Sequence, residues 1–410
     1  MSELNQLLQT YCPNGVEYKK LGDFATISRG GNFQKKDFID SGIPCIHYGQ
    51  IYTRYGLFAD KTFTFISPDC AKKQKMAVTN DIVMAVTSEN IEDVCKCIAW
   101  LGSEPAAVSG HTAIIHHNQD AKYLVYYLHS EMFFAQKRKI AHGTKVIEIT
   151  PDKLNDIIIP LPPLEIQREI VRVLDKFTML SAELSAELSA RQKQYGFYRE
   201  QLLTFGRNLP HWQILSEIAD ISTGSSNTNE GISDGLYPFF VRSQEPLRKN
   251  DYEFDETAII TAGDGVGVGK VYHYIEGKYA LHQRAYRIHI NSPAVLPRFY
   301  FHYMRANFLP YIQKTMFQGS VASIRRPMLN NFPVPVPPLD VQQRIVNVLD
   351  NFDAICSDLN IGLPAEISAR QKQYEYYRDL LLSFKDIDNI TDRQTDRQTD
   401  RQTDRQTEHN

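Results

Sequence analysis

The sequence predicts a mixed α+β fold, in which two strand-rich globular domains are separated by two long antiparallel, coiled-coil helices and related by an internal pseudo-two-fold duplication. Three observations lead to this prediction. One segment of nineteen residues occurs twice, two long stretches have helical periodicity, and short β-branched stretches occur in the rest of each half. With 410 residues, the chain is long enough for two or three domains with separate cores.

The repeat is the strongest of these signals. "IPLPPLEIQREIVRVLDKF" (159–177) returns as "VPVPPLDVQQRIVNVLDNF" (334–352), with eleven of nineteen positions identical. Further along, "SARQKQYGFYREQLLTF" (189–205) matches "SARQKQYEYYRDLLLSF" (368–384) at twelve of seventeen positions. The globular parts match only faintly, as in "LGDFATISRG" and "LSEIADISTG". This pattern indicates a gene duplication in which the segments after each domain stayed similar while the domains diverged.

Each repeated segment begins with a proline hook and continues as a helix. The hook prolines cannot be helical, and apolar residues from 166 to 205 then recur at steps of three and four. A helix over 164–205 would extend roughly 60 Å. Because globular helices average only ~10–14 residues, pairing of the two copies is favoured over burial in separate cores. "GLP" (362–364) predicts a kink or break in the second helix.

These features divide the chain into five parts. Runs such as "DIVMAV" and "TAIITA" have the β-branched density of buried strands and belong to the globular parts. The tail repeats Thr-Asp-Arg-Gln without an apolar residue, so it is predicted to be disordered. The predicted parts are the first globular domain at 1–158, a hook and central helix at 159–205, the second globular domain at 206–333, a hook and C-terminal helix at 334–385, and the tail at 386–410.

Composition narrows the class of protein. The formal net charge is −3, which counts against tight DNA binding by this chain alone but allows a binder whose partners supply phosphate contacts. The six cysteines form no CxxC pair, the start "MSELNQLLQTY" is unlike a leader peptide, and no apolar run approaches the ~18 residues of a membrane span. These features predict a cytoplasmic protein with reduced cysteines.

Searches for catalytic motifs mostly fail. "TAGDGVGVGKVY" (261–272) resembles a phosphate loop, but Val271 stands where Ser or Thr is needed. No methyltransferase motif or helicase lysine loop is found, and no cysteine and histidine spacing matches a zinc module. A metal-dependent nuclease remains an alternative, with Asp264, Glu276 and Lys278 as a D…ExK pattern that often arises by chance. We therefore expect no catalytic residues, no metal site and no cofactor bound by this chain.

Polar and basic clusters recur at similar places in the two globular domains. Arg, Lys, Asn, Gln and His beside glycine suit contacts to base edges and phosphates. Each cluster alone is typical of a solvated loop, but their recurrence on two divergent domains favours DNA contact. The candidates are Arg29, Asn32, Gln34, Lys35, Lys36, His47, Gln50, Arg54, Lys72, Lys73, His111, Lys145, Ser225, Asn227, Arg242, Gln244, Arg248, Lys249, Lys270, His282, Arg284, Arg325 and Arg326.

The doubled "PLPPLEIQREIVRVLD" and "PVPPLDVQQRIVNVLD", the trailing "ARQKQY" and the "LGDFATISRG" opening resemble the DNA-specificity subunits of Type I restriction-modification systems. The resemblance covers nearly all of residues 1–385. It implies that the globular parts are target-recognition domains, each for one half of a bipartite DNA site. The helices would space these domains and dock two methyltransferase subunits, through Pro162, Pro163, Gln167, Ile170, Pro337, Pro338, Gln342 and Ile345.

The resemblance also implies the other partners. Double-stranded DNA is the substrate of the complex, the methyltransferase subunits use S-adenosylmethionine, and restriction subunits use ATP and Mg²⁺ for translocation and cleavage. The chain itself would be non-catalytic, which agrees with the failed motif search. Besides the nuclease, a free-standing DNA-binding regulator and a coiled-coil scaffold without DNA contact remain alternatives.

Overall fold

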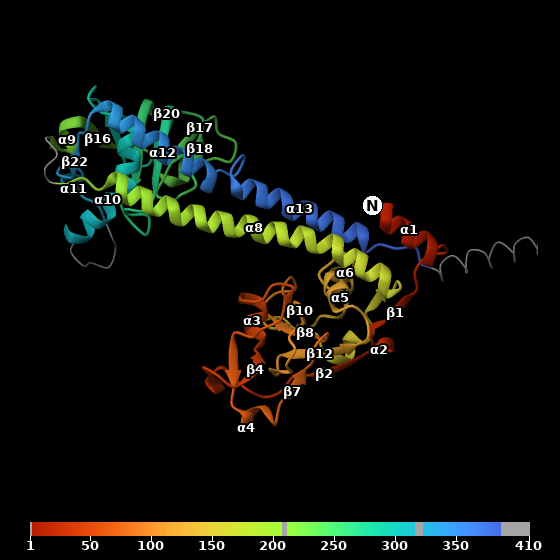
Figure 1. Cartoon of the computed structure of the whole chain (residues 1–410). Coiled ribbons are helices and arrows are strands. Elements are labelled where there is room, and N and C mark those ends of the chain that lie inside the picture. Colours follow the sequence, from red (N-terminus) through yellow and green to blue (C-terminus); the bar gives the residue numbers. More distant parts are fainter. Residues whose placement is uncertain (1, 207–210, 316–322, 387–410) are drawn as a thin grey trace, which may run out of the picture. The chain divides into compact units, whose positions relative to one another are not determined.

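The computed structural model describes residues 2–206, 211–315 and 323–386 (Figure 1). The chain divides into two compact units. Unit 1 comprises Met1–Glu183 and Ser368–Asn410, and unit 2 comprises Leu184–Ile367. The predicted disordered tail lies almost entirely outside the described residues, and the predicted domain limits remain a prediction.

Unit 1 contains two five-stranded sheets and two small two-stranded pairs. The first sheet has the order β2-β12-β8-β10-β5 and the second β3-β6-β4-β11-β7. The small pairs are β1 with β14 and β9 with β13. The strands are β1 (Tyr18–Lys20), β2 (Ala25–Arg29), β3 (Phe38–Ile39), β4 (Ile43–Ile46), β5 (Phe58–Ala59), β6 (Thr64–Ile66), β7 (Lys75–Ala77), β8 (Ile82–Ala85), β9 (Thr87–Ser88), β10 (Cys97–Trp100), β11 (Ala106–Val108), β12 (Thr112–His117), β13 (Ile147–Glu148) and β14 (Ile158–Pro160).

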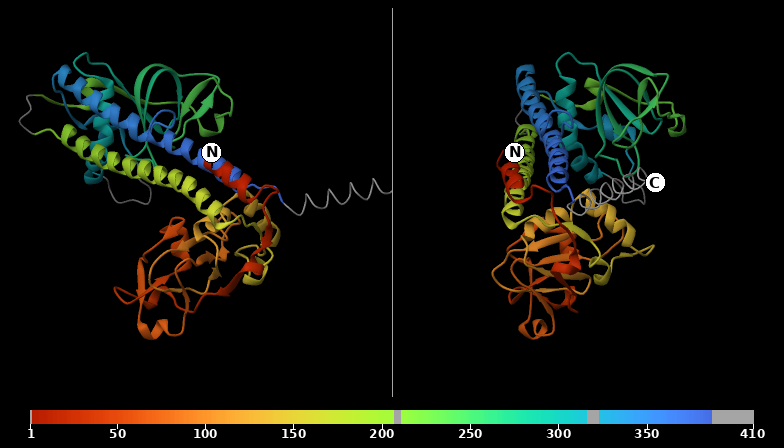
Figure 2. Two further views of the ribbon diagram at one scale, coloured as in Figure 1. Left: turned by 45° about the vertical axis from the view of Figure 1, so that its right-hand side comes forward. Right: turned by 90° about the vertical axis from the view of Figure 1, so that its right-hand side faces the viewer.

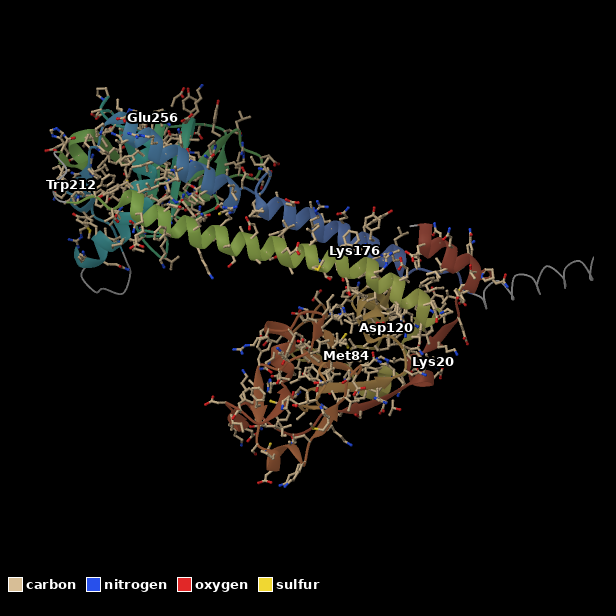
Figure 3. The ribbon with its side chains drawn as sticks, viewed as in Figure 1. Lys20, Met84, Asp120, Lys176, Trp212 and Glu256 are labelled. Carbon is tan, nitrogen blue, oxygen red and sulfur yellow. The ribbon has the colours of Figure 1, made fainter. Side chains whose placement is uncertain are left out.

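Unit 1 also contains short helices outside the repeated segments. They are α1 (Ser2–Tyr11), α2 (Leu21–Phe24), η1 (Lys35–Asp37), α3 (Tyr48–Thr53), α4 (Pro68–Ala71), α5 (Ala121–Tyr127), α6 (Glu131–Ile140) and α7 (Pro151–Leu154). Asp120, which is labelled in Figure 3, lies at the start of α5. Its side chain caps this helix by accepting a hydrogen bond from the Tyr123 amide at 3.1 Å.

Strand β8 lies within the apolar run "DIVMAV" and is buried on both faces. Alternate side chains of a strand point to opposite faces. Ile82 and Met84 pack in the core under α5, whereas Val83 and Ala85 pack in a separate core with Trp100. Both faces are therefore buried, as the "DIVMAV" run predicts.

Unit 2 contains one six-stranded sheet with the order β16-β21-β19-β20-β17-β18 and a small pair, β15 with β22. Its strands are β15 (Trp212–Ile214), β16 (Ala219–Thr223), β17 (Tyr237–Phe240), β18 (Leu247–Lys249), β19 (Phe254–Ala262), β20 (Tyr272–Leu281), β21 (Ala285–Ile290) and β22 (Pro333–Pro335). Its helices outside the repeated segments are α9 (Leu215–Ile218), η2 (Thr228–Glu230), α10 (Pro297–Thr315) and α11 (Arg326–Asn330).

The two units share a strand frame. The order β2-β12-β8-β10 in unit 1 recurs as β16-β21-β19-β20 in unit 2. In addition, β4 pairs in parallel with β11, just as β17 pairs in parallel with β20. The faint sequence match between the globular parts therefore corresponds to a real structural duplication.

Each proline hook is tied to its globular domain in the same way. The hook strands β14 and β22 pair antiparallel with β1 and β15. Behind them, the fully buried Gln167 donates to the Pro162 carbonyl at 2.8 Å and accepts from the Asp120 amide at 3.0 Å. Gln342 repeats this, donating to the Pro337 carbonyl at 2.7 Å and accepting from the Leu296 amide at 2.8 Å.

The first repeated segment forms one helix, α8 (Leu164–Leu203), whereas the second is broken into α12 (Leu339–Ser357) and α13 (Leu363–Leu381). The Asp358 carboxylate caps the break by accepting from the Asn360 amide at 2.7 Å. A Cβ on Gly362 would lie 2.4 Å from the Ala354 carbonyl oxygen, so this position requires glycine. The predicted break at "GLP" is confirmed.

Contacts of α8 with the C-terminal helices run in opposite chain order. In unit 1, Phe177 stacks on Tyr377 with ring centroids 5.4 Å apart. In unit 2, Tyr195 stacks on Phe352 at 5.7 Å, and α8 lies beside α12 in both views of Figure 2. This order is the antiparallel pairing that the periodicity predicts.

Two further sequence inferences meet the structure here. Within the described parts of the chain, no helix is long and apolar enough to span a membrane. All six cysteines are unpaired.

Candidate nucleic-acid interface

A positively charged pocket opens on the domain of unit 1, where β2 ends, α3 begins and the β11–β12 turn passes. Its volume is about 740 Å³. Four cationic side chains and no carboxylate line it. The lining residues are Arg29, Gly30, Gly31, Asn32, Phe33, Gln34, Lys35, His47, Tyr48, Lys73, Lys75, Ser109, Gly110 and His111.

This pocket gathers many of the predicted DNA-contact residues of the first domain. Seven of them line it: Arg29, Asn32, Gln34, Lys35, His47, Lys73 and His111. Sequence reasoning missed Tyr48, Lys75 and Ser109. Each lies within two residues of a predicted candidate, so the signal was present: Tyr48 follows His47, Lys75 lies two residues after Lys73, and Ser109 lies two residues before His111.

Glycines let the backbone segments around the pocket approach closely. A Cβ on Gly30 would lie 2.1 Å from the Ser109 carbonyl oxygen, and one on Gly31 would lie 2.1 Å from Gln74 Oε1. Any larger residue would push the end of β2 away from the β11–β12 turn. The "RGGN" sequence therefore sets the shape of the pocket floor.

His47 is held in place as the N-cap of α3. Its Nδ1 accepts a hydrogen bond from the Gly49 amide at 3.2 Å, and its side chain is mostly buried. Burial, followed by the positive charge of Lys35 and the proximity of His111, lowers its pKa. At neutral pH this imidazole is therefore uncharged, and the positive charge of the pocket comes from lysine and arginine.

The other predicted residues of the first domain lie elsewhere. Gln50 is buried, where its side chain accepts from the His47 amide and donates to Thr64, so it is not available to DNA. The side chains of Lys36, Arg54, Lys72 and Lys145 are exposed outside the pocket.

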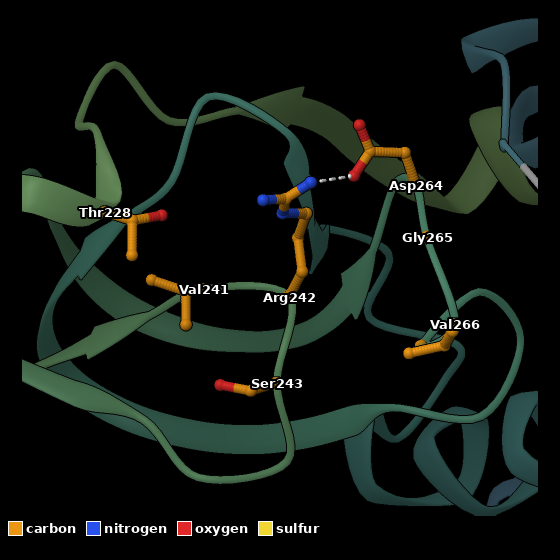
Figure 4. A pocket seen from close by; sticks show the side chains of 8 residues that line it. Thr228, Val241, Arg242, Ser243, Asp264, Gly265 and Val266 are labelled. Atoms are coloured by element: carbon orange, nitrogen blue, oxygen red, sulfur yellow. Dashed lines mark hydrogen bonds and ion pairs between the residues drawn. The ribbon is translucent and has the colours of Figure 1, made fainter. Parts of the chain in front are cut away.

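The second domain has two smaller pockets that share Asp264. One is lined by Thr228, Val241, Arg242, Ser243, Asp264, Gly265, Val266 and Gly267 (Figure 4). The other is lined by Thr223, Gly263, Asp264, Gln283, Arg284, Tyr286, Ser323 and Ile324. Two predicted DNA-contact residues, Arg242 and Arg284, therefore line neighbouring pockets on either side of Asp264.

Asp264 binds both arginines. Arg242 Nη1 donates to Asp264 Oδ1 at 2.7 Å, and Arg284 Nη1 donates to Asp264 Oδ2 at 3.2 Å. Burial alone would raise the pKa of Asp264, but the two guanidinium groups outweigh burial and lower it. The carboxylate is therefore charged at neutral pH.

The strand register shows that the pockets occupy equivalent places. Ala85 pairs with Thr112 as Ala262 pairs with Ala285. Ile46 lies opposite Val108 as Phe240 lies opposite Leu281. Counting outward from these pairs makes Tyr48, Thr87 and His111 the counterparts of Arg242, Asp264 and Arg284.

In the first domain, the positions equivalent to Asp264 and Arg242 hold the uncharged side chains of Thr87 and Tyr48. Thr87 Oγ1 lies 3.3 Å from His111 Nδ1, and the Tyr48 ring lies 5.0 Å from the His111 ring. The same position in the frame therefore carries different chemistry in the two domains.

The remaining predicted residues of the second domain fall into three groups. Lys249 and His282 are buried, and Lys249 binds Ser226 and Glu230, so both have internal roles. Arg248 and Arg326 donate to the backbone carbonyls of Gly235 and Ile221. The exposed side chains are Ser225, Asn227, Gln244, Lys270 and Arg325.

The residues predicted to dock a partner are mostly internal. Gln167, Ile170, Gln342 and Ile345 are buried. Pro162 and Pro337 are buried as well, which leaves Pro163 and Pro338 as the exposed hook prolines. Partner contact would therefore use the outer surface of the hooks, while the buried residues hold each hook to its domain.

The nuclease alternative is not supported by the geometry. Glu276 and Lys278 lie on β20 opposite Thr257 and Asp255, at the far end of β19 from Asp264. The five steps along the strand from Thr257 to Ala262 alone extend roughly 17 Å. These carboxylates therefore cannot share a metal ion.

A different cluster, His302, Asp350 and Asp353, has ligand atoms within 4.8 Å of one another among the described residues. Arg298 and Arg305, however, each donate to one of its carboxylates at 2.8 Å. In unit 1, Lys122 and Tyr126 bind Asp175 in the same arrangement, at 2.7 and 2.8 Å. The shared pattern indicates an ion pair that fixes each domain to its helix, because the guanidinium charges already balance the carboxylates.

Comparisons with known proteins agree with this organisation. The family model for the Type I restriction modification DNA specificity domain matches residues 13–191 and 212–369. The specificity subunit of the type I restriction enzymes EcoR124I and EcoR124II of Escherichia coli is 37% identical over 250 residues, which cover 55% of this chain and 61% of that subunit. The match thus spans less than two thirds of that subunit's length.

Two further matches cover nearly the whole of the compared chain. A putative type I specificity subunit of Mycoplasma pneumoniae is 32% identical over 247 residues, which cover 56% of this chain and 94% of that protein. The crystal structure of the S subunit of a type I system from M. genitalium has a TM-score of 0.57 at 14% identity, covering 90% of this chain and 96% of that chain, and so shares the fold. With its two matched regions and duplicated frame, the chain belongs to the Type I restriction modification DNA specificity family.

Proposed function

We propose that this chain is the sequence-specific DNA-recognition subunit of a Type I restriction-modification complex. Each recognition domain contacts one half of a bipartite DNA site, and the repeated hooks and helices space the domains and dock two methyltransferase subunits. The observation that carries the proposal is the equivalent position of two chemically different clusters, Tyr48, Thr87 and His111 in one domain and Arg242, Asp264 and Arg284 in the other.

Physical reasoning connects this observation to a bipartite site. A duplicated fold can present equivalent surfaces to two copies of the same partner. Docking of two such copies would therefore keep the two hooks similar in sequence. Different side chains at the same position of the frame recognise different base edges, because each base pair presents its own donor and acceptor pattern in the major groove. The two half-sites should therefore differ in sequence.

The near-neutral charge fits a division of labour. Four cations line the first pocket, but the chain as a whole has a net charge of −3. Phosphate contacts supply most non-specific affinity, so partner subunits would contribute much of it. The chain itself binds no cofactor in this proposal, while S-adenosylmethionine, ATP and Mg²⁺ serve the methyltransferase and restriction subunits. It acts in the cytoplasm and is non-catalytic.

The test is to express this chain with its methyltransferase subunits and to map methylated bases by single-molecule sequencing. We expect one asymmetric bipartite motif that disappears when the chain is omitted. Methylation that is unchanged without the chain would reject the proposal. Incubating the purified chain alone with DNA and Mg²⁺ tests the nuclease alternative, which predicts cleavage.

A further inference from the structure

Asp264 lies between two arginines and binds both of them. One carboxylate oxygen accepts from Arg242 and the other from Arg284. The two arginines come from different segments, Arg242 from the end of β17 and Arg284 from the turn between β20 and β21. A single carboxylate therefore restrains two guanidinium groups that the chain brings together from positions 42 residues apart.

The arginines keep most of their donors free. Within the part of the chain that the structure describes, each guanidinium donates only its one hydrogen bond to Asp264. A guanidinium has five N–H donors, so four remain on each. The side chains of Arg242 and Arg284 are 41% and 61% exposed, while that of Asp264 is only 22% exposed behind them.

These facts favour a base edge over a phosphate as the ligand. The carboxylate offsets one of the two positive charges, which weakens attraction to a phosphate and places a negative group close to it. A neutral guanine edge has no such penalty, and its O6 and N7 accept a bidentate pair from one arginine. An arginine already restrained by a carboxylate loses less conformational freedom when it binds.

We propose that Arg242 and Arg284 recognise guanine in one half of the DNA site, and that Asp264 is the positioning residue that orients both. This inference rests on the proposed function and deepens it by naming the base. The half-site contacted by the second domain then contains at least one G·C pair. The first domain, with Thr87 and His111 at the equivalent positions, recognises its half-site by other contacts.

The test uses the complete complex of this chain with its methyltransferase subunits. Arg242→Gln, Arg284→Gln and Asp264→Asn are compared with Lys314→Gln, which removes an exposed positive charge from α10 in the same unit, outside the repeated segments. Methylated motifs are mapped by single-molecule sequencing. Competition binding then compares DNA carrying guanine with DNA carrying 7-deazaguanine, which lacks the N7 acceptor.

We expect each of the three variants to lose roughly 10- to 100-fold of the preference for guanine at one or two positions of a single half-site. The other half-site serves as an internal control and stays unchanged, as does the whole motif in Lys314→Gln. 7-Deazaguanine should weaken binding by the wild-type complex at these positions but not by the Arg→Gln variant that has lost the contact. For Asp264→Asn, the same loss of sensitivity with unchanged thermal unfolding separates a positioning role from a purely structural one.

Two results would overturn the inference while leaving the proposed function intact. One is a wild-type bipartite motif with no guanine in the half-site that these variants affect. The other is a motif that both arginine variants leave unchanged. A wild-type complex that methylates without sequence preference would instead reject the proposed function, and the inference with it.

Discussion

Replacing Gln342 with methionine should loosen the second hook from its domain. The Gln342 side chain is fully buried and makes three hydrogen bonds, to the Leu296 amide at 2.8 Å, the Pro337 carbonyl at 2.7 Å and the Ala294 carbonyl at 3.0 Å. Methionine has a similar length and fills the same space, so the change removes the bonds without opening a large cavity.

The magnitude follows from these three bonds. Each contributes a net ~1 kcal/mol, and a buried amide left without an acceptor costs about 1–3 kcal/mol. We therefore expect the free energy of opening this region to fall by about 3–5 kcal/mol, a large part of the 5–15 kcal/mol typical of whole domains. Gln343→Met is the matched control, because Gln343 is exposed and donates only to Asn347.

Hydrogen exchange is the suitable assay, because a chain with two units need not unfold in one step. The Val336 amide of the hook, which donates to the His211 carbonyl, and the Leu296 amide, which donates to Gln342, should exchange at least about 100-fold faster in Gln342→Met. The reason is that 1.4 kcal/mol corresponds to a factor of ten. Trp212, which pairs with Pro335 of the hook, gives an independent fluorescence signal. If Gln342→Met and Gln343→Met exchange alike, the argument that this glutamine holds the hook is wrong.

Three further outcomes test other parts of the molecule. Burial lowers the pKa of His117 from 6.5 to about 4, so the unfolded chain binds the proton first as pH falls, and unit 1 loses up to about 3 kcal/mol of stability between these pH values. His117→Asn should reduce this loss, measured by urea titrations followed by Trp100 fluorescence. A dependence of stability on pH that is unchanged in the variant would contradict the assignment. Inserting a third "SAEL" after 181–188 adds roughly 6 Å to α8 and should lengthen the unspecified spacer of the DNA site by about one base pair without changing either half-site, as methylation mapping would reveal. Lys35→Ala with Lys73→Ala should lower the salt dependence of DNA binding by the complex, by about 0.9 in the log–log slope for each lost phosphate contact, and an equal slope measured by fluorescence anisotropy would place these lysines away from DNA.

The parts of the fold that sequence could predict are those set by local chemistry. Proline marked both hooks, the "GLP" segment marked the helix break, and the "DIVMAV" run marked a strand buried on both faces. Helical periodicity predicted α8 to within a few residues of its end at Leu203. In each case the residues close together in the chain are sufficient to determine the structure.

The candidate site was predicted less well because it depends on distant residues. Asp264 looked like a loop acid or a fragment of a nuclease motif, and only the strand register shows that Arg242 and Arg284 meet at its carboxylate. Tyr48 follows the candidate His47 directly in the sequence, but only the fold shows that its ring packs against His111. Composition could identify basic clusters, but not which of their members point into one pocket.

Similarity between the two copies was also open to two interpretations. Gln167 and Gln342 recur at the same place in both hooks, which suggested contact with a repeated partner. The structure instead buries both side chains against their own domains. A residue that recurs in a duplication can thus reflect a repeated internal joint as readily as a repeated external surface, and burial decides between them.

The same comparison separates the frame from the recognition surface. Where a domain meets its helix, the copies keep the chemistry: Lys122 binds Asp175 as Arg298 binds Asp350. At the pocket, the equivalent positions change from Thr87 and His111 to Asp264 and Arg284, although the strands that carry them keep their register. A pair of recognition sites need keep only the frame, and the difference between these two clusters is what an asymmetric DNA site requires.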